Sequence, residues 1–93
     1  MWSGADAFHM RAFIMIECEA GCEKSAFETI KKLPWVISAH PLFGEYDFIV
    51  RAESSAPDEL ASRIVTELRA IPGIVATRTY LEATFGGTPI EEK

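Results

Sequence analysis

The chain has 93 residues, of which 48% are hydrophobic and 25% charged, so it can form one globular domain with a modest core but not two domains. Its formal net charge of -5 argues against a nucleic-acid-binding surface, because phosphate binding needs clustered Lys and Arg. The longest apolar run, residues 12–16, is far shorter than the roughly 20 residues that span a bilayer. We therefore expect no membrane segment and a cytoplasmic protein.

Residues 1–10 lack the basic and apolar regions of a secretion signal. We interpret them as a leader or a cloning-derived segment that precedes a natural start at Met10. Cys18 and Cys22 have no second Cys/His pair nearby, so a zinc site would lack ligands and reduced thiols are expected. The sequence predicts no metal and no cofactor.

The first half of the chain reads as strand, helix, strand. Residues 11–18 form the expected first strand, and residues 22–33 the expected helix, whose apolar residues recur at helical spacing on one face. These apolar residues are Ala26, Phe27, Ile30 and Leu33. Residues 36–42 are the second expected strand, and Pro41 places it at an edge because proline has no backbone donor.

Residues 42–50 combine a predicted hairpin turn with an unusually placed carboxylate. Gly44 and Glu45 suit a two-residue type II′ turn, which favours glycine first. Asp47 then lies at the start of a third strand, expected over residues 46–52. Aspartate is depleted in strands and a buried charge needs a partner, so Asp47 requires an explanation.

The second half repeats the pattern of the first. A helix is expected to start within residues 55–59, with Pro57 in its first turn, and its apolar stripe is Leu60, Ile64, Leu68 and Ile71. The last strand is expected over residues 74–83, followed by a polar tail, residues 84–93. Residues 33–39 resemble residues 71–77, and each segment ends a helix at a proline and starts a strand.

The order β-α-β-β-α-β predicts an α+β, ferredoxin-like fold, with a four-stranded antiparallel sheet and two helices on one face. The first strand is apolar on both faces, because Ala12, Ile14 and Ile16 alternate with Phe13 and Met15. A sheet face open to water should be polar, so the uncovered face predicts a partner. We expect a homodimer that closes into an α/β barrel, and a higher oligomer of such dimers.

Taken together, these segments resemble the ligand-sensing (RAM) domain of the Lrp/AsnC family of transcriptional regulators over residues 11–83, with the Gly44-x-x-Asp47 turn as the most specific motif. The resemblance implies rings of dimers that hold an amino acid where dimers meet. It also implies that Gly44 lets backbone donors approach the ligand and that Asp47 accepts the ammonium group. The remaining ligand-binding residues that it implies are Glu45, Tyr46, Thr77 and Thr79.

The sequence departs from that family at its N-terminus. Full-length regulators carry a helix-turn-helix domain there, and ten leading residues cannot form one. We therefore expect a stand-alone sensor without direct nucleic-acid contact, which binds amino acids or co-assembles with full-length regulators.

Three other interpretations stay open from the residues alone. Asp47 would have a purely structural role if it paired with Arg51 on the same strand face or with a basic residue across an interface. The fold also suits a small dimeric α/β-barrel enzyme of monooxygenase or isomerase type, although His40 is the one plausible imidazole for the cleft between helices and sheet. A third interpretation is a structural oligomerisation module that binds no ligand.

Overall fold

The computed structural model describes residues 10–83 as one sheet and two helical segments. In chain order the elements are β1 (Met10–Cys18), α2 (Glu23–Ile30), β2 (Val36–Pro41), β3 (Phe48–Ser54), α3 (Pro57–Arg63), the π-helical turn η1 (Ile64–Leu68) and β4 (Ile74–Leu81). Met10, expected in the leader, is the first residue of β1. The rest of the predicted leader and the predicted tail lie outside the described residues. No helix within residues 10–83 is long and apolar enough to cross a membrane.

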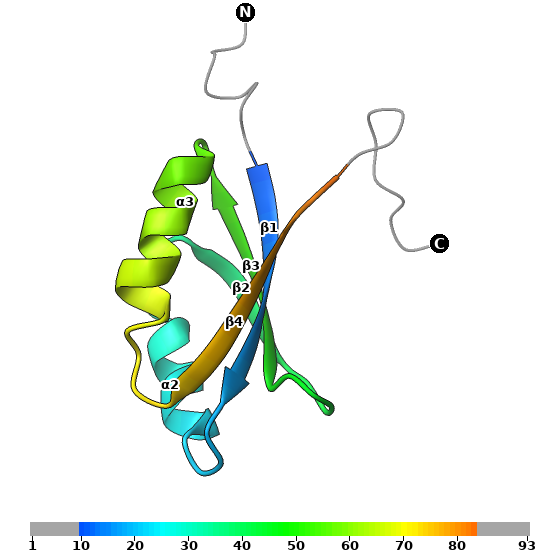
Figure 1. Ribbon diagram of the computed structural model, residues 1–93, viewed down its shortest axis with the longest axis vertical. Helices are drawn as coiled ribbons and strands as arrows, with labels where there is room; N and C mark the ends of the chain where they lie inside the picture. Colours follow the sequence, from blue (N-terminus) through cyan, green and yellow to red (C-terminus); the bar gives the residue numbers. More distant parts are fainter. Residues whose placement is uncertain (1–9, 84–93) are drawn as a thin grey trace, which may run out of the picture.

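The four strands form one antiparallel sheet in the order β2-β3-β1-β4. Both helical segments lie on the same side of this sheet (Figure 1). β2 is an edge strand, as the position of Pro41 predicted, and β4 is the other edge. The predicted α+β, ferredoxin-like architecture is confirmed.

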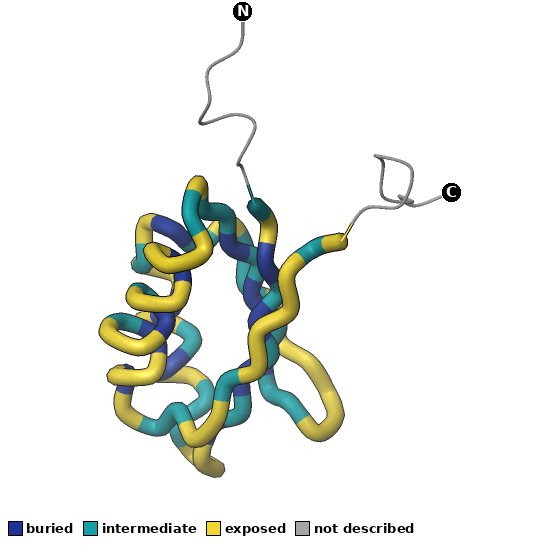
Figure 2. Tube along the Cα trace, turned by 45° about the horizontal axis from the view of Figure 1, so that its top comes forward, coloured by how far each residue is buried: buried dark blue, intermediate teal, exposed yellow. Residues whose placement is uncertain are grey.

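The core lies between the sheet and the helices. Ala12, Ile14 and Ile16 on the central strand β1 have no exposed surface. They belong to one hydrophobic cluster with the predicted apolar residues of the helices. Figure 2 shows the buried positions along the inner side of the sheet and helices, whereas most of β4 is exposed. The buried helix and loop residues are Ala26, Ile30, Trp35, Leu60, Ile64, Leu68 and Ile71.

The first helix is shorter than the sequence pattern predicted. It ends at Ile30 rather than at Leu33, because the next backbone bonds span three residues instead of four. The Leu33 N–H donates to the Ile30 carbonyl at 3.1 Å, which tightens the chain into turns before β2. Leu33 still packs against the core, so the apolar stripe was correct although the helix boundary was not.

The two repeated segments each contain a four-residue turn closed by the same backbone bond, although only the second turn has a residue with positive φ at its third position. The Val36 N–H donates to the Leu33 carbonyl at 3.1 Å, and the Ile74 N–H donates to the Ile71 carbonyl at 3.2 Å. Each bond closes a four-residue turn that leads from a helix end into a strand. Gly73 has φ +93°, as the third residue of a type II turn requires, and its carbonyl accepts the Glu19 N–H at 2.8 Å. The repeat seen in the sequence is therefore a structural repeat.

A π-helical turn interrupts the second helix, which the sequence predicted as continuous. The Arg69 N–H donates to the Ile64 carbonyl at 2.8 Å, five residues back. A stripe repeated every four residues drifts by about 40° per step around an α-helix of 3.6 residues per turn. The wider turn offsets this drift, so Leu60, Ile64 and Leu68 all stay buried.

Candidate functional site

The hairpin between β2 and β3 is wider than the predicted two-residue turn. Pro41 pairs with Phe48, and the Leu42 N–H donates to the Asp47 carbonyl at 2.8 Å, so residues 43–46 form a four-residue loop. The type II′ prediction is therefore wrong. Gly44 is still required, because its φ of +146° is unfavourable for residues with a side chain.

Asp47 joins the hairpin to the end of β1. Its backbone N–H donates to the Ile16 carbonyl at 2.8 Å, and its Oδ2 accepts the Cys18 N–H at 2.7 Å. The pairing of β1 with β4 shifts register between Glu17 and Cys18, so the carboxylate satisfies a backbone donor at an irregular strand end. This contact explains why an aspartate is favourable here despite its poor strand propensity.

The alternative ion pair between Asp47 and Arg51 is not observed among the described residues. The carboxylate near Arg51 is that of Glu53, at 4.0 Å. Asp47 is half-buried, and within residues 10–83 its second oxygen, Oδ1, accepts no hydrogen bond. One carboxylate oxygen therefore supports the fold, and the other is available to a further donor.

Cys18, beside Asp47, has an altered acidity. Burial, and to a lesser extent the negative charge of Asp47, raise the pKa of the thiol to about 11 from 9.0. Cys18 and Cys22 are both free thiols. Within residues 10–83, no three His, Cys, Asp or Glu side chains lie close enough together to hold a metal ion.

This pKa predicts a pH dependence of stability. Between pH 9 and about 11 the folded state holds the Cys18 proton more tightly than the unfolded state, so the free energy of unfolding should fall as the pH rises. Urea denaturation of the protein and of Cys18→Ala across this window tests the prediction. The variant should lose less stability than the parent over the same interval, and parallel curves would contradict it.

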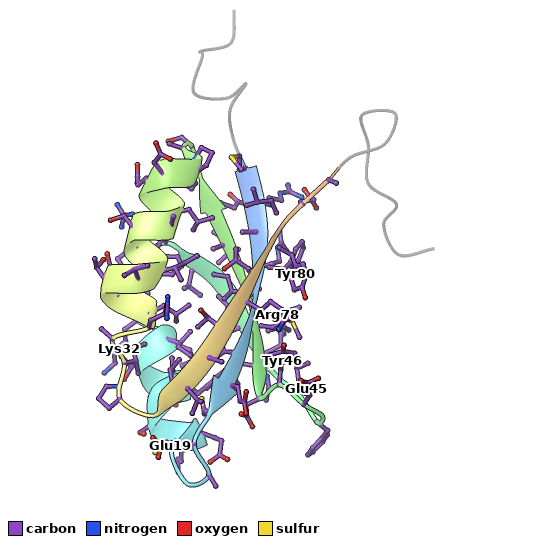
Figure 3. The ribbon with its side chains drawn as sticks, in the orientation of Figure 1. Glu19, Lys32, Glu45, Tyr46, Arg78 and Tyr80 are labelled. Atoms are coloured by element: carbon purple, nitrogen blue, oxygen red, sulfur yellow. The ribbon has the colours of Figure 1, made fainter. Side chains whose placement is uncertain are left out.

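The hairpin approaches β4 on the sheet face that turns away from the helices. Arg78 hydrogen-bonds Tyr80, and this contact, followed by the nearby Tyr46 and more weakly Glu45, raises the pKa of its guanidinium. Arg78 pairs with Met15, which alternates with the buried Ile14 and Ile16 on β1. Its side chain therefore lies on the sheet face that turns away from the helices. Figure 3 shows Glu45, Tyr46, Arg78 and Tyr80 along the side of the sheet away from α3.

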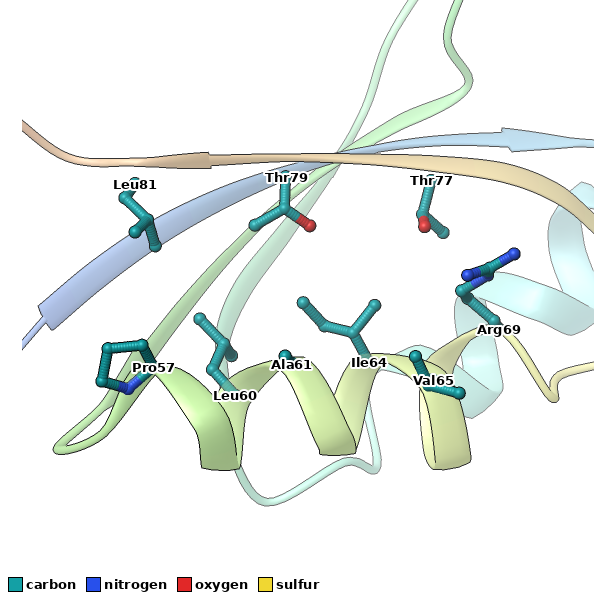
Figure 4. A pocket seen from close by; sticks show the side chains of 9 residues that line it. All are labelled: Pro57, Leu60, Ala61, Ile64, Val65, Arg69, Thr77, Thr79 and Leu81. Carbon is teal, nitrogen blue, oxygen red and sulfur yellow. The ribbon is translucent and has the colours of Figure 1, made fainter.

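A pocket of about 390 Å³ lies on the other face, between β4 and the second helical segment. Thr77 and Thr79 pair with the buried Ile16 and Ile14, so they stand on the helix-facing side of the sheet. Figure 4 shows them pointing toward α3 and η1. The lining residues are Pro57, Leu60, Ala61, Ile64, Val65, Arg69, Thr77, Thr79 and Leu81.

The chemistry of this pocket is that of an apolar groove with a few polar groups. Leu60 and Ile64 form its buried floor, whereas Arg69 is exposed and makes no ion pair within residues 10–83. The hydroxyls of Thr77 and Thr79 likewise have no hydrogen-bond partner in the described part of the chain. An apolar wall with two hydroxyls and a guanidinium that has no ion-pair partner among the described residues suits a small carboxylate with an aliphatic body.

The structure thus divides the predicted site residues between two places. Thr77 and Thr79 line the pocket, whereas Gly44, Glu45, Tyr46 and Asp47 belong to the hairpin. Arg69 was not predicted as a site residue, because it follows the last turn of a helix whose apolar residues lie at other positions. Arg78 was not predicted either, because its proximity to the hairpin residues Glu45 and Tyr46 is visible only in the folded chain.

His40 does not lie in the cleft between helices and sheet. It pairs with Ile49, which alternates with the buried Phe48 and Val50 and therefore faces away from the helices. The His40 side chain is exposed, and its Nε2 lies 3.2 Å from the Ser38 hydroxyl. The imidazole required by the enzyme alternative is therefore on the wrong face of the sheet.

Comparison with known proteins identifies related domains. Residues 11–82 match the family model for the Lrp/AsnC ligand binding domain. The chain is 32% identical to FFRP-DM1, whose crystal structure superposes with a TM-score of 0.76 over 80% of this chain and 99% of that chain. A transcriptional regulator from Neisseria meningitidis, crystallised as an L-Met complex, superposes with a TM-score of 0.76 at 20% identity, over 90% of this chain and 56% of that chain.

Two curated relatives place similar segments in different kinds of protein. One is an uncharacterized HTH-type transcriptional regulator of Pyrococcus furiosus, 28% identical over 73 residues, with 75% of this chain and 49% of the regulator covered. The other is a homocitrate synthase of Sulfurisphaera tokodaii, 30% identical over 74 residues, with 78% of this chain covered. The chain spans about half of the regulator and 16% of the enzyme.

Proposed function

Because this chain belongs to the Lrp/AsnC ligand-binding domain family, we propose that it is an amino-acid-binding and assembly domain rather than an enzyme. The observation that carries the proposal is the pocket between β4 and α3, which combines an aliphatic floor with two hydroxyls and a guanidinium that makes no ion pair within residues 10–83. The L-Met complex of the Neisseria meningitidis regulator, which shares the fold, supports an amino acid as the ligand.

The pocket favours an aliphatic amino acid. Arg69 presents N–H donors that would bind the ligand carboxylate, and Thr77 and Thr79 would hydrogen-bond the groups around its α-carbon. The ligand side chain would then lie against Leu60 and Ile64, where burial of each methylene contributes about 0.8 kcal/mol.

The ammonium group requires a carboxylate that the pocket itself lacks, because no Asp or Glu is among its lining residues. The Oδ1 of Asp47 accepts no hydrogen bond from the described residues, and Glu45 is exposed two positions earlier, but both belong to the hairpin. A site completed by the hairpin of a second copy would unite the two groups of predicted residues. In this proposal Gly44 allows the close approach of the hairpin backbone, and Tyr46 borders the ligand.

The uncovered sheet face supports self-association as part of this proposal. Phe13, Met15 and Ile49 are only half-buried there, and Tyr80 is exposed next to them. A second copy's sheet would cover these residues in a homodimer that forms an α/β barrel, and such dimers would join further into a ring.

The partners of such an assembly would be full-length Lrp/AsnC regulators. The match to the Pyrococcus furiosus regulator supports co-assembly through the shared domain. The match to a small part of a homocitrate synthase supports the view that this type of domain also accompanies an enzyme. The position of His40 gives no support to catalysis by the domain itself.

Isothermal titration calorimetry with the standard amino acids tests the proposed function. An aliphatic amino acid should bind, and Arg69→Gln should weaken its affinity by about tenfold, since a charge-assisted hydrogen bond contributes roughly 1.5–3 kcal/mol, reduced here by solvent exposure. Arg63→Gln is the matched control, because Arg63 has the same charge but is paired with Glu59 and Glu67. An absence of heat with every amino acid, or equal affinity in both variants, would refute the proposal.

A further inference from the structure

Phe43 is the most exposed large hydrophobic residue of the described chain. Its exposed fraction is 108%, so it makes essentially no packing contact within its own chain. It lies in the loop of the β2–β3 hairpin, between Leu42 and Gly44. An aromatic ring that is fully exposed in the single chain offers a large apolar surface that a partner can bury, and aromatic residues are common among the anchors of interfaces.

The mouth of the β4–α3 pocket has complementary properties. Val65 on the helical side and Leu81 on the strand side keep 57% and 51% of their surfaces exposed, so the apolar walls are open to solvent. Ala61 and Thr79 between them are also exposed and leave room for a ring. A pocket of about 390 Å³ falls within the size range of pockets that bind small ligands.

A chain cannot bring its own Phe43 to its own pocket. Figure 1 shows the hairpin extending away from the body of the domain on the side opposite α3, whereas the pocket lies between α3 and β4. We propose that Phe43 of one copy docks into the mouth of the β4–α3 pocket of a second copy.

Charge complementarity supports a second copy as the occupant. Glu45 is exposed two residues from Phe43, and the exposed Arg69 at the pocket makes no ion pair within residues 10–83. Docking of the ring would bring these opposite charges together at the edge of the contact. The guanidinium has five N–H donors, enough for both Glu45 and a ligand carboxylate.

The geometry of this contact determines the type of assembly. Hairpin and pocket are different surfaces of the chain, so the contact is heterologous and propagates into a closed ring or an open array. A phenylalanine ring buries at most about 200 Å², well below the roughly 1,000 Å² of a stable interface. Each contact is therefore weak alone, and the assembly depends on several contacts formed together.

This inference rests on the proposed function through the shared pocket and through the hairpin of a second copy, which the proposed ligand site also uses. Assembly is measured without added amino acid, and ligand binding is measured by calorimetry. Loss of one signal with retention of the other therefore identifies which proposal has failed.

Size-exclusion chromatography with light scattering, over a series of protein concentrations, tests the contact. The parent protein should form species larger than a dimer. Phe43→Ala, which removes the ring, and Ala61→Trp, which blocks the pocket, should each reduce the mass to that of a dimer or smaller. A mixture of the two variants should again form larger species, because the hairpin of Ala61→Trp can dock into the intact pocket of Phe43→Ala.

Val75→Ala is the matched control. Val75 is 58% exposed but belongs neither to the hairpin nor to the pocket, so its substitution should leave the mass unchanged. The inference is overturned if the parent protein never exceeds a dimer or if Phe43→Ala assembles like the parent. It is also overturned if the mixture stays at the masses of its components, since the hairpin would then contact a different surface.

Discussion

Replacement of Gly73 by alanine is expected to lower the free energy of unfolding by roughly 2–4 kcal/mol, through backbone strain and steric overlap together. The φ of +93° at Gly73 is unfavourable for any residue with a Cβ. An added Cβ would also lie 2.5 Å from the Cβ of Cys22 and 3.0 Å from its Sγ. Relief of this overlap would require the turn before β4 to move away from the turn before α2.

Gly21→Ala is the matched control for this substitution. Gly21 has nearly the same φ, +91°, but no atom lies within 4 Å of an added Cβ. Its substitution should cost only the backbone term, roughly 1–2 kcal/mol. Urea denaturation of both variants then isolates the overlap with Cys22 as the difference between the two losses, and equal losses would show that the two turns are not in close contact.

The arrangement of the fold was predictable because it depends on local patterns that repeat. The two helix-to-strand turns, at Leu33–Val36 and Ile71–Ile74, carry the same proline and the same backbone bond, so the two halves can be aligned with each other from their residues alone. The alternation of β1 indicated a strand with two apolar faces, and the structure places this strand inside the sheet, with its inner face in the middle of the core.

The π-helical turn and the width of the hairpin could not be predicted in this way. The turn at Ile64–Leu68 keeps apolar residues that repeat every four positions buried against the sheet. Helical propensity describes single residues and does not include this packing against the sheet. The hairpin loop is set by the bond between Leu42 and Asp47, and Asp47 is in turn held by β1, which is distant in sequence. Both features depend on tertiary contacts.

The sequence pointed to two groups of candidate residues, and their role in binding stays a prediction, but it did not predict how the fold arranges them. Thr77 and Thr79 were expected to lie near Asp47, yet they face the helices while Asp47 caps the end of β1. Within one chain these residues do not form a single site. Arg69 supplies the cationic group of the pocket, and its importance could be seen only once the helix was packed against β4.

Asp47→Asn is expected to separate the structural role of Asp47 from its proposed role in binding. The amide oxygen can still accept the Cys18 N–H, so the free energy of unfolding should change by less than about 0.5 kcal/mol. The negative charge is lost, so the affinity for the amino acid should fall by roughly 10–100-fold, the equivalent of about 1.5–3 kcal/mol for a charge-assisted hydrogen bond.

Asp47→Ala removes both the acceptor for the Cys18 N–H and the negative charge, so it is the reference against which Asp47→Asn is compared. It leaves the Cys18 N–H without its acceptor, which should cost roughly 1–3 kcal/mol of stability in addition to the loss of binding. Both substitutions remove the charge that contributes to the raised pKa of Cys18, so the pKa of that thiol should fall in each. An Asp47→Asn protein that shows the lower thiol pKa but binds the amino acid as tightly as the parent would restrict Asp47 to its role at the end of β1.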